Sequence, residues 1–165
     1  MLISALRCVV DTSLLIDLYV GEVLSAAFCL PFTLAAPDVI VEELVEPDGR
    51  ALVARGLSPI ELSGAEVERV FHICARFRNV SVNDLFALVA AESRGATLLT
   101  SDRHLRTAAE ALGIQVLGTL WLLEEMVGHR LVSAFAAAEA VERMLKRGRR
   151  LPRRECLRLL TDWRK

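Results

Sequence analysis

The chain has 165 residues, a length typical of one domain, and 53% of them are hydrophobic, which is ample material for a core. No apolar run approaches the ~20 residues that a membrane-spanning helix needs, and the first residues lack the basic start and long apolar stretch of a signal peptide. We therefore expect one domain over residues 1–165, located in the cytoplasm and without a membrane partner.

Positive charge is concentrated at the C-terminal end of the chain. The formal net charge is −1, but residues 143–165 carry ten Lys or Arg and two acids, which leaves about −9 on the first 142 residues. The densest part of this segment suits a phosphate backbone, although a solvated helix end and loop is the alternative. The candidate RNA-binding residues are Arg147, Arg149, Arg150, Arg153 and Arg154.

Cysteine and histidine residues do not form a metal motif. The four cysteines are far apart, no C-x-x-C pair occurs, and the three histidines are isolated from one another. This spacing excludes a zinc finger and predicts reduced, mostly buried thiols.

Strands and helices alternate in the first part of the predicted structure. Short runs of β-branched residues indicate strands, and apolar residues at helical spacing indicate helices. In chain order we expect a strand over 6–10, helices over 14–19 and 22–30, a strand over 32–36, a helix over 38–45 that stops at Pro47-Asp48-Gly49, and a strand over 57–62.

The same alternation continues to residue 118, after which the pattern is helical only. The expected elements are helices over 65–77 and 82–93, a strand over 97–100, a helix over 103–112, a strand over 114–117, and helices over 119–127, 132–146 and 152–163. Because parallel strands require crossovers that helices normally supply, this order predicts an α/β fold: a three-layer α/β/α sandwich with a central parallel sheet and additional C-terminal helices.

Two aspartates, Asp11 and Asp102, each follow a predicted strand and precede a helix. In a parallel sheet both carboxylates lie at the carboxyl edge, where open α/β sheets bind ligands, and together they can hold a hard cation such as Mg²⁺ or Mn²⁺. Each also has a structural explanation as a helix N-cap. Asp84, three residues after Ser81, fits a capping box, and Glu43 fits an ordinary surface glutamate.

Taken together, these acids occur in an order that resembles the PIN-domain family. The matching stretches are Val9 to Asp17 (VVDTSLLID), Val39 to Leu44 (VIVEEL), Ser81 to Asp84 (SVND) and Leu98 to Asp102 (LLTSD). The first and last stretches are the most specific, and the resemblance covers roughly residues 7–128. Residues 129–165 resemble the longer helical C-terminus of some PIN proteins.

The resemblance implies a ribonuclease whose site contains Asp11, Glu43, Asp84 and Asp102. It implies that three of these, Asp11, Asp84 and Asp102, bind Mg²⁺ or Mn²⁺, and that the hydroxyls of Ser13 and Thr100 support the site. The family's glutamate precedes a leucine, which favours Glu43 over Glu42. Some family members have a further acid after the last aspartate, whereas Arg103 and His104 follow it here. The sequence therefore does not decide whether the site holds one metal ion or two.

The resemblance also implies an RNA substrate, a homodimer and, in the toxin branch of the family, a small antitoxin partner. A stand-alone RNA-processing nuclease is the alternative within the enzyme class. The alternative outside it is a PIN fold that binds RNA or protein without cutting.

Three other α/β classes fit the sequence less well. A haloacid-dehalogenase phosphatase has D-x-D, whereas Ser13 stands at the second position. A response-regulator receiver needs a lysine after a late strand, and the only lysines are Lys146 and Lys165. Neither glycine-rich nucleotide-binding motif is present.

Overall fold

The structure is a computed structural model that describes residues 7–165. Residues 1–6 lie outside the described residues. Two expectations concern them: that they are not part of a signal peptide, and that the first strand begins at residue 6. Among the described residues, no helix is both long and apolar enough to cross a membrane.

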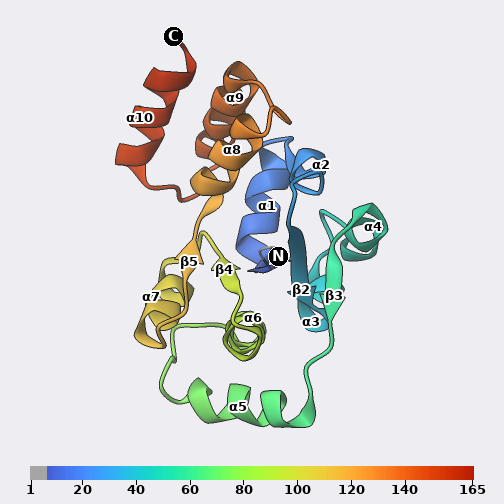
Figure 1. Cartoon of the computed structure of the whole chain (residues 1–165). Coiled ribbons are helices and arrows are strands. Elements are labelled where there is room, and N and C mark those ends of the chain that lie inside the picture. Colours follow the sequence, from blue (N-terminus) through green and yellow to red (C-terminus); the bar gives the residue numbers. More distant parts are fainter. Residues whose placement is uncertain (1–6) are drawn as a thin grey trace, which may run out of the picture.

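A parallel sheet forms the centre of the fold (Figure 1). Residues 7–165 contain five strands in the order β3-β2-β1-β4-β5, and every neighbouring pair is parallel. Their bounds are β1 Arg7–Val10, β2 Thr33–Pro37, β3 Ser58–Ile60, β4 Thr97–Leu99 and β5 Val116–Leu117. The order reverses direction at β1, so the crevice between the carboxyl ends of β1 and β4 is the topological switch point, where α/β sheets bind ligands.

Register places the ends of β1 and β4 side by side. Val10 pairs with Leu99, and the backbone N–H of Asp11 donates to the carbonyl oxygen of Leu99 at 3.3 Å. The residues that follow these two strands therefore meet at one edge of the sheet.

Helices occupy both sides of the sheet (Figure 1). On one side, α6 packs against β1, β2 and β4, with α5 outside it, and on the other α1 contacts α8 and α9. The helices are α1 Thr12–Val20, α2 Leu24–Ala27, α3 Asp38–Glu43, α4 Gly49–Arg55, α5 Gly64–Cys74, α6 Val82–Arg94, α7 Arg103–Ala111, α8 Thr119–Gly128, α9 Ala134–Lys146 and α10 Arg153–Trp163. The predicted three-layer α/β/α fold with C-terminal helices is confirmed.

Two helices differ from the sequence-based expectation. The Pro47-Asp48-Gly49 segment was predicted only to end a helix, but Asp48 also begins α4, because its side chain accepts the N–H of Ala51 at 2.8 Å. A side chain at Gly49 would collide with the carbonyl oxygen of Val41, so glycine allows α4 to lie close against α3. The helix predicted over 22–30 is only the short α2.

Cysteine burial is mixed. All four thiols are free, and Cys8 and Cys156 are buried, whereas Cys29 is exposed. Burial raises the pKa of Cys8 to about 12, so this thiol stays protonated and unreactive.

Candidate active site

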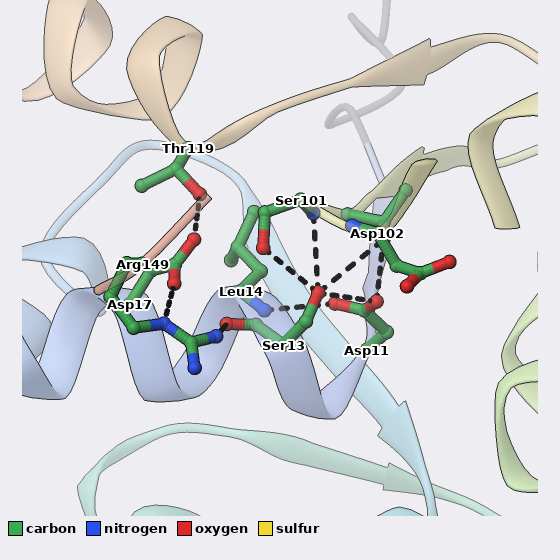
Figure 2. A network of polar contacts seen from close by, with 9 residues as sticks. Asp11, Ser13, Leu14, Asp17, Ser101, Asp102, Thr119 and Arg149 are labelled. Atoms are coloured by element: carbon green, nitrogen blue, oxygen red, sulfur yellow. Dashed lines mark hydrogen bonds and ion pairs between the residues drawn. The ribbon is translucent and has the colours of Figure 1, made fainter. Parts of the chain in front are cut away.

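Asp11 is the innermost acid of the candidate site. It caps the N-terminus of α1, where its Oδ1 accepts the backbone N–H of Leu14 at 2.9 Å. Its Oδ2 accepts the hydroxyl of Ser13 at 2.7 Å (Figure 2). The same oxygen accepts the hydroxyl of Thr100 at 2.5 Å. The side chain is 0% exposed, so the sequence-predicted helix cap is also a fully buried carboxyl group.

Thr100 links the ends of β1 and β4. Its Oγ1 donates to Asp11 and accepts the backbone N–H of Asp102 at 2.9 Å. Asp102 is half-buried and caps α7, with its Oδ1 accepting the N–H of Leu105 at 2.8 Å. Both hydroxyls assigned by resemblance, Ser13 and Thr100, therefore contact Asp11 directly.

Asp84 and Glu43 approach from the other helices. Asp84 lies in the first turn of α6, where its backbone N–H donates to the N-cap hydroxyl of Ser81 at 3.1 Å. Glu43, at the end of α3, is exposed and accepts hydrogen bonds from the Thr12 hydroxyl at 2.8 Å and from the Asn83 amide. Glu43 thus connects the starts of α1 and α6.

Electrostatic effects between these acids show that they share one region. Burial raises the pKa of Asp11 to about 7, hydrogen bonds from Thr100, Leu14 and Ser13 oppose that rise, and the negative charge of Asp84 adds to it. Burial also raises the pKa of Asp84, and the charges of Asp102 and Glu43 raise it further. The four acids predicted from the sequence therefore form an electrostatically coupled group.

This group suits a hard divalent cation in its donor chemistry and charge. Carboxylate oxygens are the ligands that Mg²⁺ and Mn²⁺ prefer, and a cation would offset the repulsion that raises the pKa of Asp84. Within residues 7–165, however, no three His, Cys, Asp or Glu side chains are already grouped so that they could hold one ion. One oxygen each of Asp11 and Asp102 accepts the backbone N–H of a helix N-terminus.

The C-terminal arginines fall into two kinds. Arg147, Arg150, Arg153 and Arg154 are exposed. Arg150 lines a groove of about 780 Å³ that also contains Asp102, Thr100 and Trp121. Arg149 instead forms an ion pair with the buried Asp17, so its guanidinium is directed into the protein (Figure 2).

Several residues around the acids were not identified from the sequence. Thr12 and Asn83 hold Glu43, Ser101 donates through its backbone and hydroxyl to Ser13, and Asp17 pairs with Arg149. Thr12, Asn83 and Ser101 lie directly beside predicted acids, which is a usable signal. Asp17 ends the first stretch that matches the family, but the sequence did not identify Arg149 as its partner.

Comparisons with known proteins agree with this architecture. The model of a PIN-domain family, DUF3368, matches residues 7–165. A search of curated proteins finds no sequence that matches the chain.

Two solved structures share the fold. A PilT N-terminus domain protein, SSO1118 from the hyperthermophilic archaeon Sulfolobus solfataricus P2, has a TM-score of 0.52 and 15% identity, with 74% of this chain and 94% of that chain covered. PAE2754 from Pyrobaculum aerophilum has a TM-score of 0.56 and 18% identity, and the match covers 75% of this chain and 98% of that chain. At these identities the likeness concerns the fold alone.

Proposed function

Because the chain belongs to the PIN-domain family, whose members are generally nucleases, we propose that it is a divalent-metal-dependent endoribonuclease that hydrolyses phosphodiester bonds of RNA. The observation that carries this proposal is the buried Asp11 at the topological switch point, coupled electrostatically to Asp84. A buried acid with a raised pKa at the topological switch point of an α/β sheet is typical of a functional site.

The proposed roles follow from the positions of the side chains. Asp11, Asp84 and Asp102 would bind Mg²⁺ or Mn²⁺, which when bound lowers the pKa of a water molecule and neutralises charge on a phosphate. The hydroxyls of Ser13 and Thr100 orient Asp11, since both donate to its Oδ2. Glu43, held by Thr12 and Asn83, adds negative charge next to Asp84 and can hold an attacking water.

The surface next to the acids suits a nucleic-acid backbone, and we propose RNA as the substrate. Acidic groups repel a phosphate backbone, so a nuclease of this kind needs cations near the site to hold its substrate. Arg150 lies in the same groove as Asp102, and Arg147, Arg153 and Arg154 are exposed next to it in the sequence. We therefore assign backbone binding to these four arginines.

A second function has one observation in its favour. The three aspartates are not grouped for binding an ion, which suits a PIN fold that binds RNA or a protein partner without cutting.

If the protein is a ribonuclease, we further propose that it is a toxin inhibited by a small antitoxin protein and that it forms a homodimer. A neighbouring small gene that encodes a DNA-binding protein would support the toxin role, and mass photometry would test the dimer.

The direct test of the proposed activity uses a mixed-sequence single-stranded RNA and a DNA of the same sequence. Each is incubated with the wild-type protein in Mg²⁺, Mn²⁺ or EDTA. We expect internal cleavage of RNA in either metal, little cleavage of DNA, and none in EDTA. A folded protein that binds RNA but leaves it intact in both metals would favour the binding module.

A further inference from the structure

Arg149 lies on the segment between α9 and α10, and it forms a partly buried ion pair that the proposed reaction does not use. Its Nε lies 2.5 Å from Oδ1 of Asp17, a residue of α1 that is 0% exposed. Its Nη2 donates to the carbonyl oxygen of Ser13 at 3.2 Å. The guanidinium thus binds both Ser13 and Asp17, which lie one helical turn apart (Figure 2).

The end of α9 directs Arg149 toward α1. Gly148 has a φ of +76°, a left-handed conformation that L side chains rarely adopt. The N–H of Gly148 donates to Leu145 O at 3.0 Å and that of Arg149 to Met144 O at 2.9 Å, which closes the helix end. The chain therefore reverses direction at Gly148, and the Arg149 side chain extends back to the first turns of α1.

Ser13 connects this ion pair to Asp11. Its carbonyl oxygen accepts from Arg149, while its hydroxyl donates to Oδ2 of Asp11 at 2.7 Å. The same hydroxyl oxygen accepts the backbone N–H of Ser101 at 3.2 Å, which ties it to the segment after β4. A shift of the first turn of α1 would therefore change both the cap and the direction of Asp11.

Stability alone gives little reason for an ion pair whose acid is fully buried and whose arginine side chain is 27% exposed. Replacing a buried pair with apolar side chains of similar volume is often neutral or stabilising, because the desolvation of two charges offsets their attraction. Asp17 has one other side-chain partner among the described residues, the hydroxyl of Thr119 at 2.8 Å. The pair joins three segments, α1, the start of α8 and the α9–α10 connection, next to the acidic site.

We propose that Arg149 is a positioning residue for the acidic site: by binding Ser13 and Asp17 together, it fixes the first turn of α1 and with it the orientation of Asp11. The consequence for catalysis rests on the proposed function, but the effect on α1 does not. In this account the C-terminal helices are connected to the site through Arg149.

The test compares Arg149→Met, which keeps a long side chain without the charge, with Arg149→Lys and with Arg50→Met at an exposed position of α4. Amide hydrogen exchange is measured in metal-free protein at Leu14, whose N–H binds Asp11, and at Leu88, buried in α6. We expect Arg149→Met to speed exchange at Leu14 about tenfold more than at Leu88. Arg149→Lys, which keeps the charge but not the planar group of donors, should restore part of the protection.

Two further readouts address the site itself. Arg149→Met should weaken Mn²⁺ binding about tenfold, as loss of a residue that orients a ligand does, and should lower kcat while KM for RNA stays unchanged. Arg50→Met should change neither Mn²⁺ binding nor Leu14 exchange. If Arg149→Met does not fold, the double variant Asp17→Asn/Arg149→Met, which removes both charges, replaces it.

Wild-type Leu14 exchange and Mn²⁺ affinity in a folded Arg149 variant would overturn the proposal, whatever its melting temperature. A wild-type protein that neither binds Mn²⁺ nor cuts RNA would instead refute the proposed function. In that case the exchange at Leu14, which needs no metal and no substrate, still decides whether Arg149 positions α1.

Discussion

At the residue scale, the fold holds Asp11 in a place where a carboxylate is costly. Complete burial raises its pKa to about 7, so in the absence of a cation this group is largely protonated below neutral pH. Three hydrogen-bond donors reduce the cost of the charged form without removing it. A bound cation would therefore stabilise the ionised form of Asp11 and lower its pKa.

This arrangement predicts a pH dependence of stability. The folded-state pKa of Asp11 lies above its unfolded value of about 3.9, so its contribution is present at low pH and is lost as pH rises through about 7. In EDTA, we expect the unfolding free energy of the wild type to fall by roughly 3 kcal/mol more between pH 5 and pH 8 than that of Asp11→Asn. Urea titrations at the two pH values measure this difference.

A control for this prediction is Asp48→Asn, the same change at the N-cap of α4, where the side chain is exposed. It should keep the pH dependence of the wild type. Equal pH dependence in wild type and Asp11→Asn would mean that Asp11 ionises as freely in the folded protein as in the unfolded chain.

Thr100 provides a second prediction at this scale. Thr100→Val removes the hydroxyl that donates to Asp11 and accepts from Asp102, so we expect a loss of about 1–3 kcal/mol in stability and at least roughly a tenfold loss in cleavage rate. Thr97→Val, at the start of β4, is the matched control, because its buried hydroxyl binds Gln115 and not an acid of the site. Stability measurements and single-turnover cleavage separate the two effects. Equal cleavage by both variants would argue against a role for Thr100 in the site.

The residues of the site differ in how far the sequence reveals them. Asp11 and Asp102 are predictable because each ends an apolar strand and begins a helix, and the structure puts each at such a junction. The role of Arg149 is not predictable from the sequence, because it belongs to a basic segment whose other candidate RNA-binding arginines are exposed. Its partner Asp17 lies 132 positions away in the sequence, and only the packing of α9 on α1 brings them together.

At the element scale, the strands bring residues that are far apart in the sequence to one edge, and the C-terminal segment places positive charge beside them. We expect Arg150, Arg153 and Arg154 changed together to Ala to weaken RNA binding and to lower the slope of log affinity against log salt by about 2, since each lost phosphate contact to a single strand removes ~0.7. Fluorescence anisotropy over a range of salt concentrations measures the slope.

Three exposed arginines elsewhere, Arg50, Arg55 and Arg78, serve as a control with the same change in net charge. Their replacement by Ala should lower affinity less and leave the slope close to that of the wild type. Equal slopes for the two triple variants would show that the C-terminal arginines act only through overall charge.

The sequence predicts most elements, and the exceptions have physical causes. The pattern identified each of the five strands of residues 7–165, and three of them, β1, β2 and β4, are largely buried apolar runs between turns. It did not identify α4, because Asp48-Gly49 after a proline is typical of a turn. Here Asp48 caps a helix, and Gly49 tolerates close contact with α3, which only the tertiary structure requires.

At the scale of the whole molecule, the first 142 residues carry net negative charge and residues 143–165 carry net positive charge. Residues of both parts line the groove beside Asp102. The coupled acids destabilise the metal-free protein, because repulsion and burial both raise their pKa values. A cation that binds only the folded state must therefore raise the melting temperature.

We expect 5 mM Mg²⁺ or Mn²⁺ to raise the melting temperature by several degrees at pH 8, since a ligand at roughly 100 times its Kd contributes about 2.7 kcal/mol. The increase should be much smaller for Asp11→Asn. Differential scanning fluorimetry with Na⁺ at matched ionic strength separates specific binding from screening. A melting temperature that is independent of the divalent cation would count against a metal site at these acids.

The measurement that tests the central claim most directly is the cleavage of single-stranded RNA by wild type, Asp11→Asn, Asp102→Asn and Asp48→Asn in Mn²⁺ and in EDTA. Asparagine can keep each helix cap, so all three variants should fold. We predict that Asp11→Asn and Asp102→Asn lose cleavage by at least about a hundredfold, while Asp48→Asn cuts as the wild type does. Metal-dependent cleavage that persists in Asp11→Asn would contradict the assignment of these acids as the active site.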